Sequence, residues 1–334
     1  MKGVIPVAGK GTRLYPQTHT KPKPLVELAG KPVIGHILDR FEQSKINEVV
    51  LVVGYMKEQL IDYVDNAFGS KFNEIYYVEQ DNREGLGHAI YQAKDVVNDE
   101  PVIIALGDMI FEKGYNEFIL EHEKDGGLDG SIGIKKVKEP SHYGIATIQN
   151  NSIKKLEEKP DEPESNNAIS GVYIIENTKE LFNSLEYLIE NEIRGKGNEF
   201  QLTDALQQMV ENGVKLGNFE VKDWYDCGRP KTLLEANKTL LKQNTYKINK
   251  FEHSLVNKPV YVGENVKIEN SIIGPNVSVS DHVEIKNSIV QNTILGKGSK
   301  VKDINLVDSI VGEEAEVTGE KNSLNIGDNS KLEF

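Results

Sequence analysis

The sequence contains a single cysteine, Cys227, and lacks any apolar run near the ~20 residues that a membrane-spanning helix needs. One cysteine excludes an internal disulfide framework and a cysteine metal cluster, a pattern typical of a reducing compartment. The first apolar stretch, at residues 4–8, is too short for a signal peptide and leads directly into a glycine-rich turn. We therefore expect a cytoplasmic protein with no membrane partner.

Basic residues are also too few to balance the acidic ones, 39 against 52, so the 334 residues carry a net charge of −13. Binding to a polyanionic backbone requires a basic surface, so we expect no nucleic-acid partner. The exception is the segment 10–31, which contains one acid, Glu27, and five basic residues: Lys10, Arg13, Lys21, Lys23 and Lys31. This segment is either a solvated loop or the place where a small polyanion binds, and the spacing alone leaves both interpretations open.

Over residues 1–243, short apolar runs alternate with amphipathic segments. The expected strands are 4–8, 49–53, 75–79, 102–106, 130–135, 144–148 and 171–175. The expected helices are 34–43, 57–68, 87–97, 201–212 and 231–241. Strands that alternate with helices are typical of a mostly parallel sheet with helices on both faces. We therefore predict an α/β domain at 1–243, followed by a polar linker at 244–258.

From residue 259 the pattern changes, because aliphatic residues recur at a spacing of about six. The series consists of Val260, Val266, Ile272, Val277, Val283, Ile289, Val301 and Val307. Such a repeat, with glycines at corners, is typical of a parallel β-helix, in which each coil buries its inward side chains only on its neighbours. We predict a short hexapeptide-like β-helix domain at 259–334, with an irregular β-rich tail as the alternative. A few coils leave exposed edges, which predicts a homo-oligomer.

The loop Gly9-Lys10-Gly11-Thr12-Arg13 follows the first expected strand. Its glycines allow backbone N–H groups to face a phosphate without interference from a Cβ atom. A dinucleotide-binding fold would need a glycine where Leu14 stands and an acid where Gly54 follows the second strand. A P-loop would need a Gly-Lys-Ser/Thr triplet, which this segment lacks. The loop is therefore predicted to be a phosphate-binding turn of another class.

Two cations near this loop have the character that phosphoryl chemistry requires. Arg13 and Lys23 would place fixed positive charge over oxygens on which negative charge accumulates. Lys23 stands between Pro22 and Pro24, which stiffen the loop and reduce the freedom that the ammonium group loses on binding. For Lys21, a surface charge without a function is the alternative.

Two aspartates are candidate metal ligands. Asp108 follows the expected strand 102–106 through Gly107, at the C-terminal edge of the sheet, where ligands of open α/β folds bind. Asp226 lies far away in the sequence, in the segment 223–228. Carboxylates from two separate elements suit Mg²⁺, which prefers oxygen ligands and keeps waters and substrate phosphates as the others. The alternative for either aspartate is a loop cap or a turn former.

With these pieces in order, the sequence resembles the sugar nucleotidyltransferases. It is similar to glucose-1-phosphate thymidylyltransferases and, at its beginning, to bacterial UTP-glucose-1-phosphate uridylyltransferases. The resemblance is carried by 8–14, 22–25, Gln80, 85–87, 107–108, 143–144, 157–160, 171–173, 201–204 and 224–228. It implies a Rossmann-like, mostly parallel sheet in the catalytic domain, and the tail is expected to be a short left-handed parallel β-helix.

The resemblance also implies a role for each matching residue. Nucleotide binding falls to Ala8, Gly9, Gly11, Thr12, Gln80 and Gly85. Sugar-phosphate binding falls to Gly144, Glu158, Lys159, Gly171 and Tyr173. The catalytic set comprises Arg13, Lys23, Asp108, Lys159 and Asp226. Within that set Arg13 and Lys23 would hold the leaving pyrophosphate, and Asp108 and Asp226 would hold Mg²⁺, the expected cofactor.

The implied reaction transfers a nucleotidyl group from an NTP, dTTP or UTP, to a sugar-1-phosphate, with glucose-1-phosphate favoured. In-line, Mg²⁺-assisted attack would give an NDP-sugar and pyrophosphate. The first loop is one residue shorter than the common thymidylyltransferase loop, and Met109 stands where those enzymes often have Asn. These departures leave the base and one sugar contact open. The alternatives are a catalytically silent homologue that binds nucleotide sugars, and cytidylyl transfer to a polyol phosphate.

Overall fold

The structure, a computed structural model, describes residues 1–124, 126–222, 224–244, 246 and 250–320. The chain forms two compact units. The N-terminal unit comprises Met1–Val26 and Lys31–Leu233, and the C-terminal unit comprises Glu27–Gly30 and the chain from Leu234 onward. The predicted linker and β-helix domain include 245, 247–249 and 321–334, which lie outside the described residues. The predicted domain boundaries at residues 243 and 258 stay a prediction.

A nine-stranded sheet forms the centre of the N-terminal unit. Its first part runs parallel, in the order β5 (Glu74–Glu79), β4 (Glu48–Val53), β1 (Lys2–Pro6) and β6 (Val102–Ala105). Its second part continues with β11 (Asn167–Ile175), β8 (Gly130–Lys136), β12 (Leu216–Glu220), β10 (Ser152–Glu158) and β9 (Gly144–Gln149). The sheet thus carries the predicted parallel strands in its first part, whereas only β8 and β12 pair in parallel in the second.

One antiparallel pair, β9 with β10, arises from local turn chemistry that the predicted strand pattern did not include. Strands β9 and β10 form a hairpin across Asn150 and Asn151, which have φ angles of 51° and 63°. Asparagine tolerates this left-handed conformation, and two such residues make the tight turn that joins antiparallel strands. Strand β10 was absent from the strands expected from the sequence.

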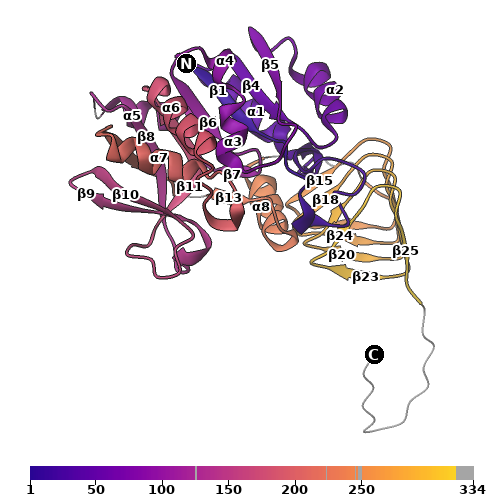
Figure 1. Cartoon of the computed structure of the whole chain (residues 1–334). Coiled ribbons are helices and arrows are strands. Elements are labelled where there is room, and N and C mark those ends of the chain that lie inside the picture. The colour runs from indigo at the N-terminus through magenta and orange to yellow at the C-terminus, as the bar shows by residue number, and fades with distance from the viewer. Residues whose placement is uncertain (125, 223, 245, 247–249, 321–334) are drawn as a thin grey trace. The chain divides into compact units, whose positions relative to one another are not determined.

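Helices cover the sheet (Figure 1). They are α1 (Val33–Glu42), α2 (Lys57–Phe68), α3 (Leu86–Tyr91), α4 (Lys94–Val97), α5 (Tyr115–Lys124), α6 (Thr178–Glu190) and α7 (Leu202–Glu211). A last helix, α8 (Pro230–Gln243), begins in the N-terminal unit and continues into the C-terminal unit. The single helix predicted at 87–97 is two helices, because the N–H of Ala93 donates to the carbonyl of Ile90, three residues back, and ends α3.

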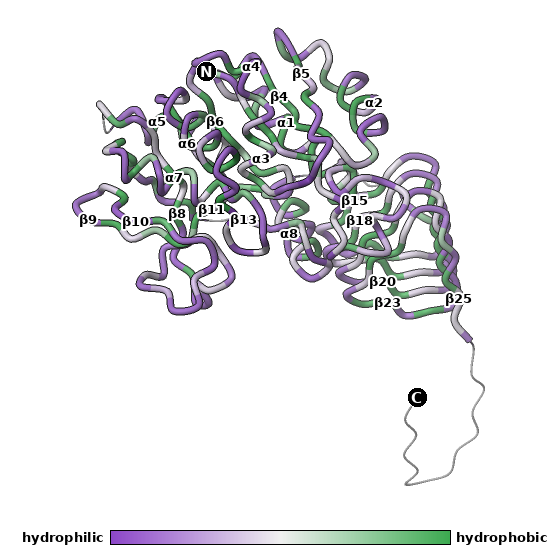
Figure 2. Tube along the Cα trace, viewed as in Figure 1, coloured by the Kyte–Doolittle hydropathy of each residue, from purple (hydrophilic) through white to green (hydrophobic). Residues whose placement is uncertain are grey.

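Both faces of the parallel strands β1, β4 and β6 are buried, as the unbroken apolar runs predicted. Val50 and Val52 of β4 belong to a core shared with α3, α6 and α7, while Leu51, which points to the opposite face, is equally inaccessible to solvent. On that opposite face the rings of Phe41 in α1 and Tyr115 in α5 stack with centroids 4.0 Å apart. Figure 2 shows hydrophobic residues along these central strands. Such burial on both faces explains why β4 has no polar alternation.

The C-terminal unit contains three parallel four-stranded sheets. One contains β14 (Leu255–Val256), β17 (Ile272–Ile273), β20 (Ile289–Gln291) and β23 (Asn305–Val307). The second contains β15 (Val260–Val262), β18 (Val277–Val279), β21 (Ile294–Leu295) and β24 (Ile310–Val311). The third contains β16 (Lys267–Glu269), β19 (Glu284–Lys286), β22 (Lys300–Lys302) and β25 (Glu316–Thr318). This repeated three-strand coil is the β-helix-like arrangement that the sequence predicted, and its handedness stays a prediction.

The inward side chains of this β-helical segment are not all those of the six-residue series. Ile272, Ile289 and Val307 are 37%, 39% and 49% exposed, whereas Ile273 and Val290, which follow the first two in their strands, are buried. The coils repeat after 17 residues at first and after 16 later, as the pairs Lys267–Glu284 and Lys300–Glu316 show. Because neither length is a whole multiple of six, the inward position shifts within each coil.

Candidate functional site

The glycine loop directly follows β1, an inner strand of the nine-stranded sheet. Strand β1 ends at Pro6, two residues before the predicted end, and the N–H of Val7 still donates to the carbonyl of Val52 in β4. Gly11 has a φ of 67°, and a Cβ atom there would stand 2.7 Å from the Cβ of Lys23. A side chain at this position would therefore be strained and would push on Lys23. Of the other predicted loop residues, Ala8 is buried, whereas Gly9, Thr12 and Arg13 are exposed.

The two predicted metal ligands are brought together by a pair of short strands. Asp108 lies immediately before β7 (Met109–Phe111), and Asp226 is the last residue of β13 (Trp224–Asp226). The strands pair antiparallel with Asp226 opposite Met109, and the N–H of Cys227 donates to the carbonyl of Asp108 over 2.8 Å. Carboxylates far apart in the sequence thus become neighbours at the end of β6.

Lys23 makes an ion pair with Asp108 through Nζ and Oδ2, and its ammonium group is mostly buried. Burial alone would raise the pKa of Asp108, but Lys23, by charge and hydrogen bond, and the guanidinium of Arg13 outweigh it, so the pKa is lowered. Asp108 is therefore held as a carboxylate at neutral pH. A buried anion of this kind requires a paired cation.

Gly228 marks the point on which the charged groups converge. A Cβ atom on this glycine would stand 2.6 Å from Oδ1 of Asp226, 2.9 Å from Nζ of Lys23 and 3.3 Å from Nη2 of Arg13. Its N–H donates to Oδ1 of Asp226 over 2.7 Å. The structure therefore brings Arg13, Lys23, Asp108 and Asp226 into one cluster, which we call the cation–carboxylate cluster.

A cavity of about 210 Å³ opens beside this cluster. It is lined by Pro6, Val7, Gly9, Lys23, Pro24, Leu86, Leu106, Gly107 and Asp108. Its lining combines apolar side chains with one cation and one anion. This combination suits a ligand with a flat apolar part and a charged part.

The residues of the cluster fit a magnesium ion. Asp108 and Asp226 offer hard, anionic oxygen atoms, and Mg²⁺ is commonly held by one or two carboxylates with waters and phosphates completing the shell. Within the described part of the chain, no group of three His, Cys, Asp or Glu residues is placed to hold a metal. The thiol of Cys227 is no competitor, because burial first and the nearby Asp108 second raise its pKa and keep it neutral.

A second group of predicted residues surrounds Glu158. In the hairpin of β9 and β10, Gly144 lies opposite Glu158, and a Cβ atom on Gly144 would stand 3.0 Å from Oε2 of that carboxylate. Oε2 accepts a 2.8 Å hydrogen bond from the hydroxyl of Thr203, and Oε1 makes a 3.0 Å ion pair with Lys159. Lys159 has a φ of 45° and is half exposed, so its ammonium group is accessible to a ligand.

Gly171 and Tyr173 connect this group to the end of β6. The N–H of Leu106 donates to the carbonyl of Gly171 over 3.0 Å, and Tyr173 pairs with Ile104 in the same ladder. Gly171 has a φ of 83°, and a Cβ atom there would stand 2.9 Å from Leu106. Tyr173 is buried, and burial, followed by the charge of Glu158, raises the pKa of its phenol.

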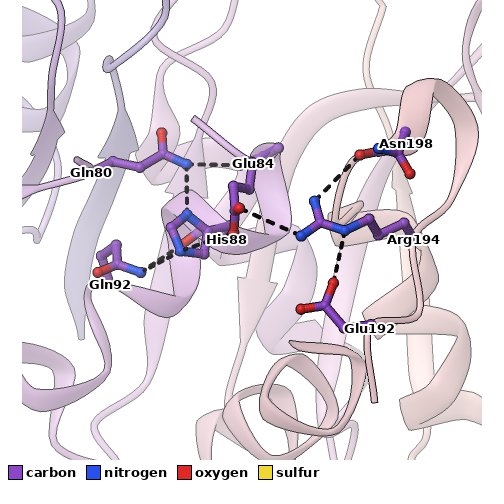
Figure 3. A network of polar contacts seen from close by, with 8 residues as sticks. Gln80, Glu84, His88, Gln92, Glu192, Arg194 and Asn198 are labelled. Carbon is purple, nitrogen blue, oxygen red and sulfur yellow. Dashed lines mark hydrogen bonds and ion pairs between the residues drawn. The ribbon is translucent and has the colours of Figure 1, made fainter. Parts of the chain in front are cut away.

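Gln80, one of the two predicted base-reading residues, lies in the network of Figure 3. The buried side chain of Gln80 donates from Nε2 to the carbonyl of Gly85 over 3.1 Å and lies 3.1 Å from Nδ1 of His88. Gly85 has a φ of 117°, and a Cβ atom on it would stand 2.5 Å from the carbonyl oxygen of Phe200. A glycine is therefore needed for the loop to approach the segment before α7.

Several residues of the site were not given a role from the sequence. Thr203 orients Glu158, and the ring of Trp224 lies 5.4 Å from that of Tyr143, beside Gly144. Arg194 lies with its guanidinium 4.1 Å from the ring centroid of Phe200 and makes an ion pair with Glu84, next to Gly85 (Figure 3). Thr203 and Trp224 stood inside quoted motifs, whereas nothing in the sequence pattern singled out Arg194.

The fold and the charged edge of its sheet define an α/β protein whose glycine loop, cations and carboxylates meet beside one cavity. The chain belongs to the nucleotidyl transferase family, whose model matches residues 2–243. The bifunctional protein GlmU of Methanocaldococcus jannaschii is 36% identical over 264 residues, which are 77% of this chain and 59% of that protein. The chain thus spans little more than half the length of the archaeal GlmU proteins that it matches.

Two further similarities cover nearly the whole of the other protein. The UTP–glucose-1-phosphate uridylyltransferase AglF of Haloferax volcanii is 31% identical over 249 residues, 73% of this chain and 98% of that protein. A solved structure of a UDP-glucose pyrophosphorylase complexed with UDP-glucose superposes with a TM-score of 0.63. It shares 28% identity and covers 73% of this chain and 99% of the other. Among the described residues, no helix combines the length and the apolar character needed to cross a membrane.

Proposed function

We propose that the protein is a sugar-1-phosphate nucleotidyltransferase that joins a sugar-1-phosphate to an NTP and releases pyrophosphate. The observation that carries the proposal is the cation–carboxylate cluster beside the cavity. Arg13, Lys23 and Asp226 lie within 3.3 Å of the position that a Cβ atom on Gly228 would take, and Asp108 makes an ion pair with Lys23. Family membership and the names of the relatives support the same reaction class.

In this proposal, each part of the site handles one part of the substrates. The loop of Ala8, Gly9, Gly11 and Thr12 binds the triphosphate through backbone N–H groups. Arg13 and Lys23 offset the charge that develops on the leaving pyrophosphate, which removes much of the repulsion between two anionic substrates. Before a ligand arrives, Lys23 neutralises Asp108, so the cluster is held together in its charged form.

The sugar phosphate would bind at the group around Glu158. Lys159 offers an ammonium group for the phosphate, and the carboxylate of Glu158, fixed by Thr203, accepts hydrogen bonds from sugar hydroxyls. Gly144, Gly171 and Tyr173 shape the pocket, while Gln80 and Gly85 read the base. Mg²⁺, held by Asp108 and Asp226, would add Lewis-acid stabilisation of phosphate charge when bound.

The reaction needs no side chain as a general base. A phosphomonoester has a second pKa of about 6, so at neutral pH its oxygen is already an anion able to attack the α-phosphorus. The contribution of the protein is then to align that oxygen with the leaving pyrophosphate and to neutralise charge. Glucose-1-phosphate with dTTP or UTP is the favoured pair, in agreement with the sequence motifs.

A pyrophosphate-release screen tests the proposal. The four common ribonucleoside triphosphates and dTTP are combined with glucose-, galactose-, mannose- and N-acetylglucosamine-1-phosphate, and CTP is also combined with a polyol phosphate. We expect release with at least one sugar-1-phosphate, and the highest kcat/KM with dTTP or UTP and glucose-1-phosphate. Binding of an NDP-sugar without release in any combination would instead identify a silent homologue. Release only with CTP and the polyol phosphate would identify a cytidylyltransferase.

A further inference from the structure

His88 in α3 has both of its ring nitrogens in contact with glutamine side chains (Figure 3). Nδ1 lies 3.1 Å from Nε2 of Gln80, and Nε2 lies 3.1 Å from the side-chain nitrogen of Gln92, one helical turn later. Nε2 also lies 3.9 Å from Oε2 of Glu84. The imidazole side chain is 15% exposed and Gln80 is 5% exposed, so these contacts are largely shielded from water.

The carbonyl oxygen of Gly85 determines the orientation of the Gln80 amide. It lies 3.1 Å from Nε2 of Gln80, and a carbonyl oxygen accepts a hydrogen bond from an N–H but repels an amide oxygen. The N–H of Phe200 donates to the carbonyl of Glu84 over 2.7 Å, and its carbonyl accepts from the N–H of Gly87 over 2.8 Å. These two bonds fix the backbone on both sides of Gly85, so the side-chain nitrogen of Gln80 has a fixed position.

This orientation fixes the tautomer of His88. One hydrogen on Nε2 of Gln80 bonds to Gly85, and the second can bond to Nδ1 of the ring only if that nitrogen carries no proton. The proton of the neutral ring then lies on Nε2, on the side of the Glu84 carboxylate, which favours an N–H there. Gln92 adapts, because the last torsion of a glutamine is two-fold and its amide can turn the oxygen toward this N–H.

With both amide hydrogens used, Gln80 offers a ligand only its oxygen. Figure 3 shows Oε1 pointing away from His88, and within the described ranges of the chain no group donates a hydrogen bond to it. A buried acceptor without a partner is unfavourable, and a ligand that brings an N–H satisfies it. Proteins read a base through hydrogen bonds to its edge, where uracil and thymine carry an imide N–H and cytosine carries an acceptor at the same atom.

We propose that His88 is a positioning residue for base recognition: its unprotonated Nδ1 holds the amide of Gln80 so that only the amide oxygen is free to accept from a base. The site then selects a base with an imide N–H, uracil or thymine, over cytosine. This inference rests on the proposed function, in which Gln80 reads the base of the NTP. It connects the preference for dTTP or UTP to one ring nitrogen of a residue that was given no role from the sequence.

Three substitutions in the full-length chain test the role of this nitrogen. His88→Leu removes the acceptor and keeps much of the side-chain volume. His88→Asn places an amide oxygen near the position of Nδ1, so this conservative variant should restore the acceptor. His122→Leu is the matched control, because His122 is a buried histidine of the same unit whose Nδ1 lies 2.8 Å from the hydroxyl of Ser131 and whose Nε2 faces Glu176. Melting curves establish that each variant is folded.

The first readout is the tautomer of His88 in the wild type, which needs neither a ligand nor turnover. Histidine is labelled with ¹⁵N, and long-range ¹H–¹⁵N correlation spectra are recorded at about pH 8.5, where an imidazole is ordinarily neutral. The ring signals that are missing from His88→Asn identify this residue among the seven histidines. We expect the tautomer with the proton on Nε2 and none on Nδ1. A proton on Nδ1, or an average of the two tautomers, would overturn the inference.

The second readout is NTP binding with Mg²⁺ and without a sugar phosphate, measured by isothermal titration calorimetry with UTP, dTTP and CTP. In the wild type we expect UTP or dTTP to bind more tightly than CTP. His88→Leu should lower this ratio of affinities about fivefold, the factor for one lost hydrogen bond, because the second amide hydrogen of Gln80 loses its partner. His88→Asn and His122→Leu should keep the wild-type ratio.

Each other outcome of the binding experiment counts against the role of His88. No preference for UTP or dTTP in the wild type, an unchanged ratio in His88→Leu, an equal loss in His122→Leu, or no recovery in His88→Asn would each overturn the inference. In turnover, the loss should appear in the KM for the NTP and not in the KM for the sugar phosphate. If the wild type releases no pyrophosphate with any substrate pair, the proposed function fails, and the tautomer and the base selectivity of NTP binding still decide whether His88 positions Gln80.

Discussion

The cation–carboxylate cluster and the group around Glu158 lie in the same unit, yet opposite charge dominates their surroundings. At the first, Lys23 and Arg13 outweigh the effect of burial and lower the pKa of Asp108. At the second, burial and then the charge of Glu158 raise the pKa values of Asp204 and Tyr173. The surroundings of the cation–carboxylate cluster thus stabilise a negatively charged group, and the surroundings of Glu158 destabilise one.

This difference separates the two kinds of ligand group that the proposed substrates carry. A triphosphate brings several negative charges and suits the region where cations prevail. A sugar brings neutral hydroxyls, which donate hydrogen bonds to carboxylates without charge repulsion. Lys159, half exposed and paired with Glu158, supplies a cation where the phosphate of the sugar would otherwise meet an acidic surface.

The largest expected effect comes from the carboxylates of the cluster. Asp108→Asn and Asp226→Asn should each lower kcat about 100-fold or more, because an amide is a poor ligand for Mg²⁺ and metal stabilisation contributes several kcal/mol. Rates are measured across a Mg²⁺ titration. The control is Asp281→Asn in the C-terminal unit, since Asp281 accepts a hydrogen bond from the N–H of Glu264 in a turn. Near-wild-type rates for both cluster variants at saturating Mg²⁺ would remove the metal assignment.

Loss of one cation should have a smaller and more selective effect. Arg13→Ala is expected to lower kcat about tenfold or more, since a charge-assisted hydrogen bond to the leaving pyrophosphate contributes about 1.5–3 kcal/mol. The KM for the sugar phosphate should change little. Lys267→Ala, which removes an exposed cation paired with Glu284, should leave both constants unchanged. If only the KM for the sugar phosphate rises in Arg13→Ala, the two regions have been assigned to the wrong substrates.

For a substitution in the group around Glu158, we expect the opposite pattern, in which the sugar-phosphate KM changes and the NTP KM does not. Glu158→Gln keeps the size of the side chain and removes its charge, so the KM for the sugar phosphate should rise about tenfold while the KM for the NTP stays constant. Glu157→Gln is the neighbouring control, because Glu157 pairs with Lys155 and has no part in the proposed pocket. Equal effects of the two substitutions on the sugar-phosphate KM would show that general charge, rather than the position of Glu158, is responsible.

The smallest effect concerns stability and pH. Burial and then Glu158 raise the pKa of Asp204 in the folded state, so its ionised form at neutral pH is less favourable in the fold than in the unfolded chain. This disadvantage fades as the pH falls through the folded-state pKa and is gone below about 4, near the value in the unfolded chain. The difference in melting temperature between Asp204→Asn and wild type should therefore decrease from pH 7 to pH 3. A difference that is constant or that increases on acidification would contradict the acidic character of this region.

The sequence was most informative where the structure depends on local pattern. Helix α2 has the predicted bounds of 57–68, and β4 begins one residue before the predicted strand 49–53, because each is a clear periodic run. Helix α6 was missed although its signal was present: Asn177 caps it by accepting from the N–H of Glu180, three residues later. Strands β7 and β13 contain three residues each, and only their pairing across the chain defines them.

The candidate site likewise combines features that the sequence pattern predicted with features that only long-range contacts define. The motifs indicated which residues matter, and the structure shows Lys23, Asp108 and Asp226 close together. The roles assigned to these residues stay predictions. The sequence could not indicate the hydrogen bonds from the N–H of Ala29 to Asn237 and Ser278, because these positions share no sequence pattern. The six-residue series likewise predicted the coils but misplaced three inward positions, since neither coil length, 17 or 16 residues, is a whole multiple of six.

The central claim is that a sugar phosphate oxygen attacks the α-phosphorus of the NTP, and isotope transfer tests it most directly. Glucose-1-phosphate labelled with ¹⁸O at its non-bridging phosphate oxygens is incubated with the NTP selected by the screen, and the products are analysed by mass spectrometry. The account predicts that the NDP-glucose retains the whole label and that the released pyrophosphate contains none. Label that leaves the sugar as inorganic phosphate or appears in pyrophosphate would show that a different bond breaks, and nucleotidyl transfer by this site would be contradicted.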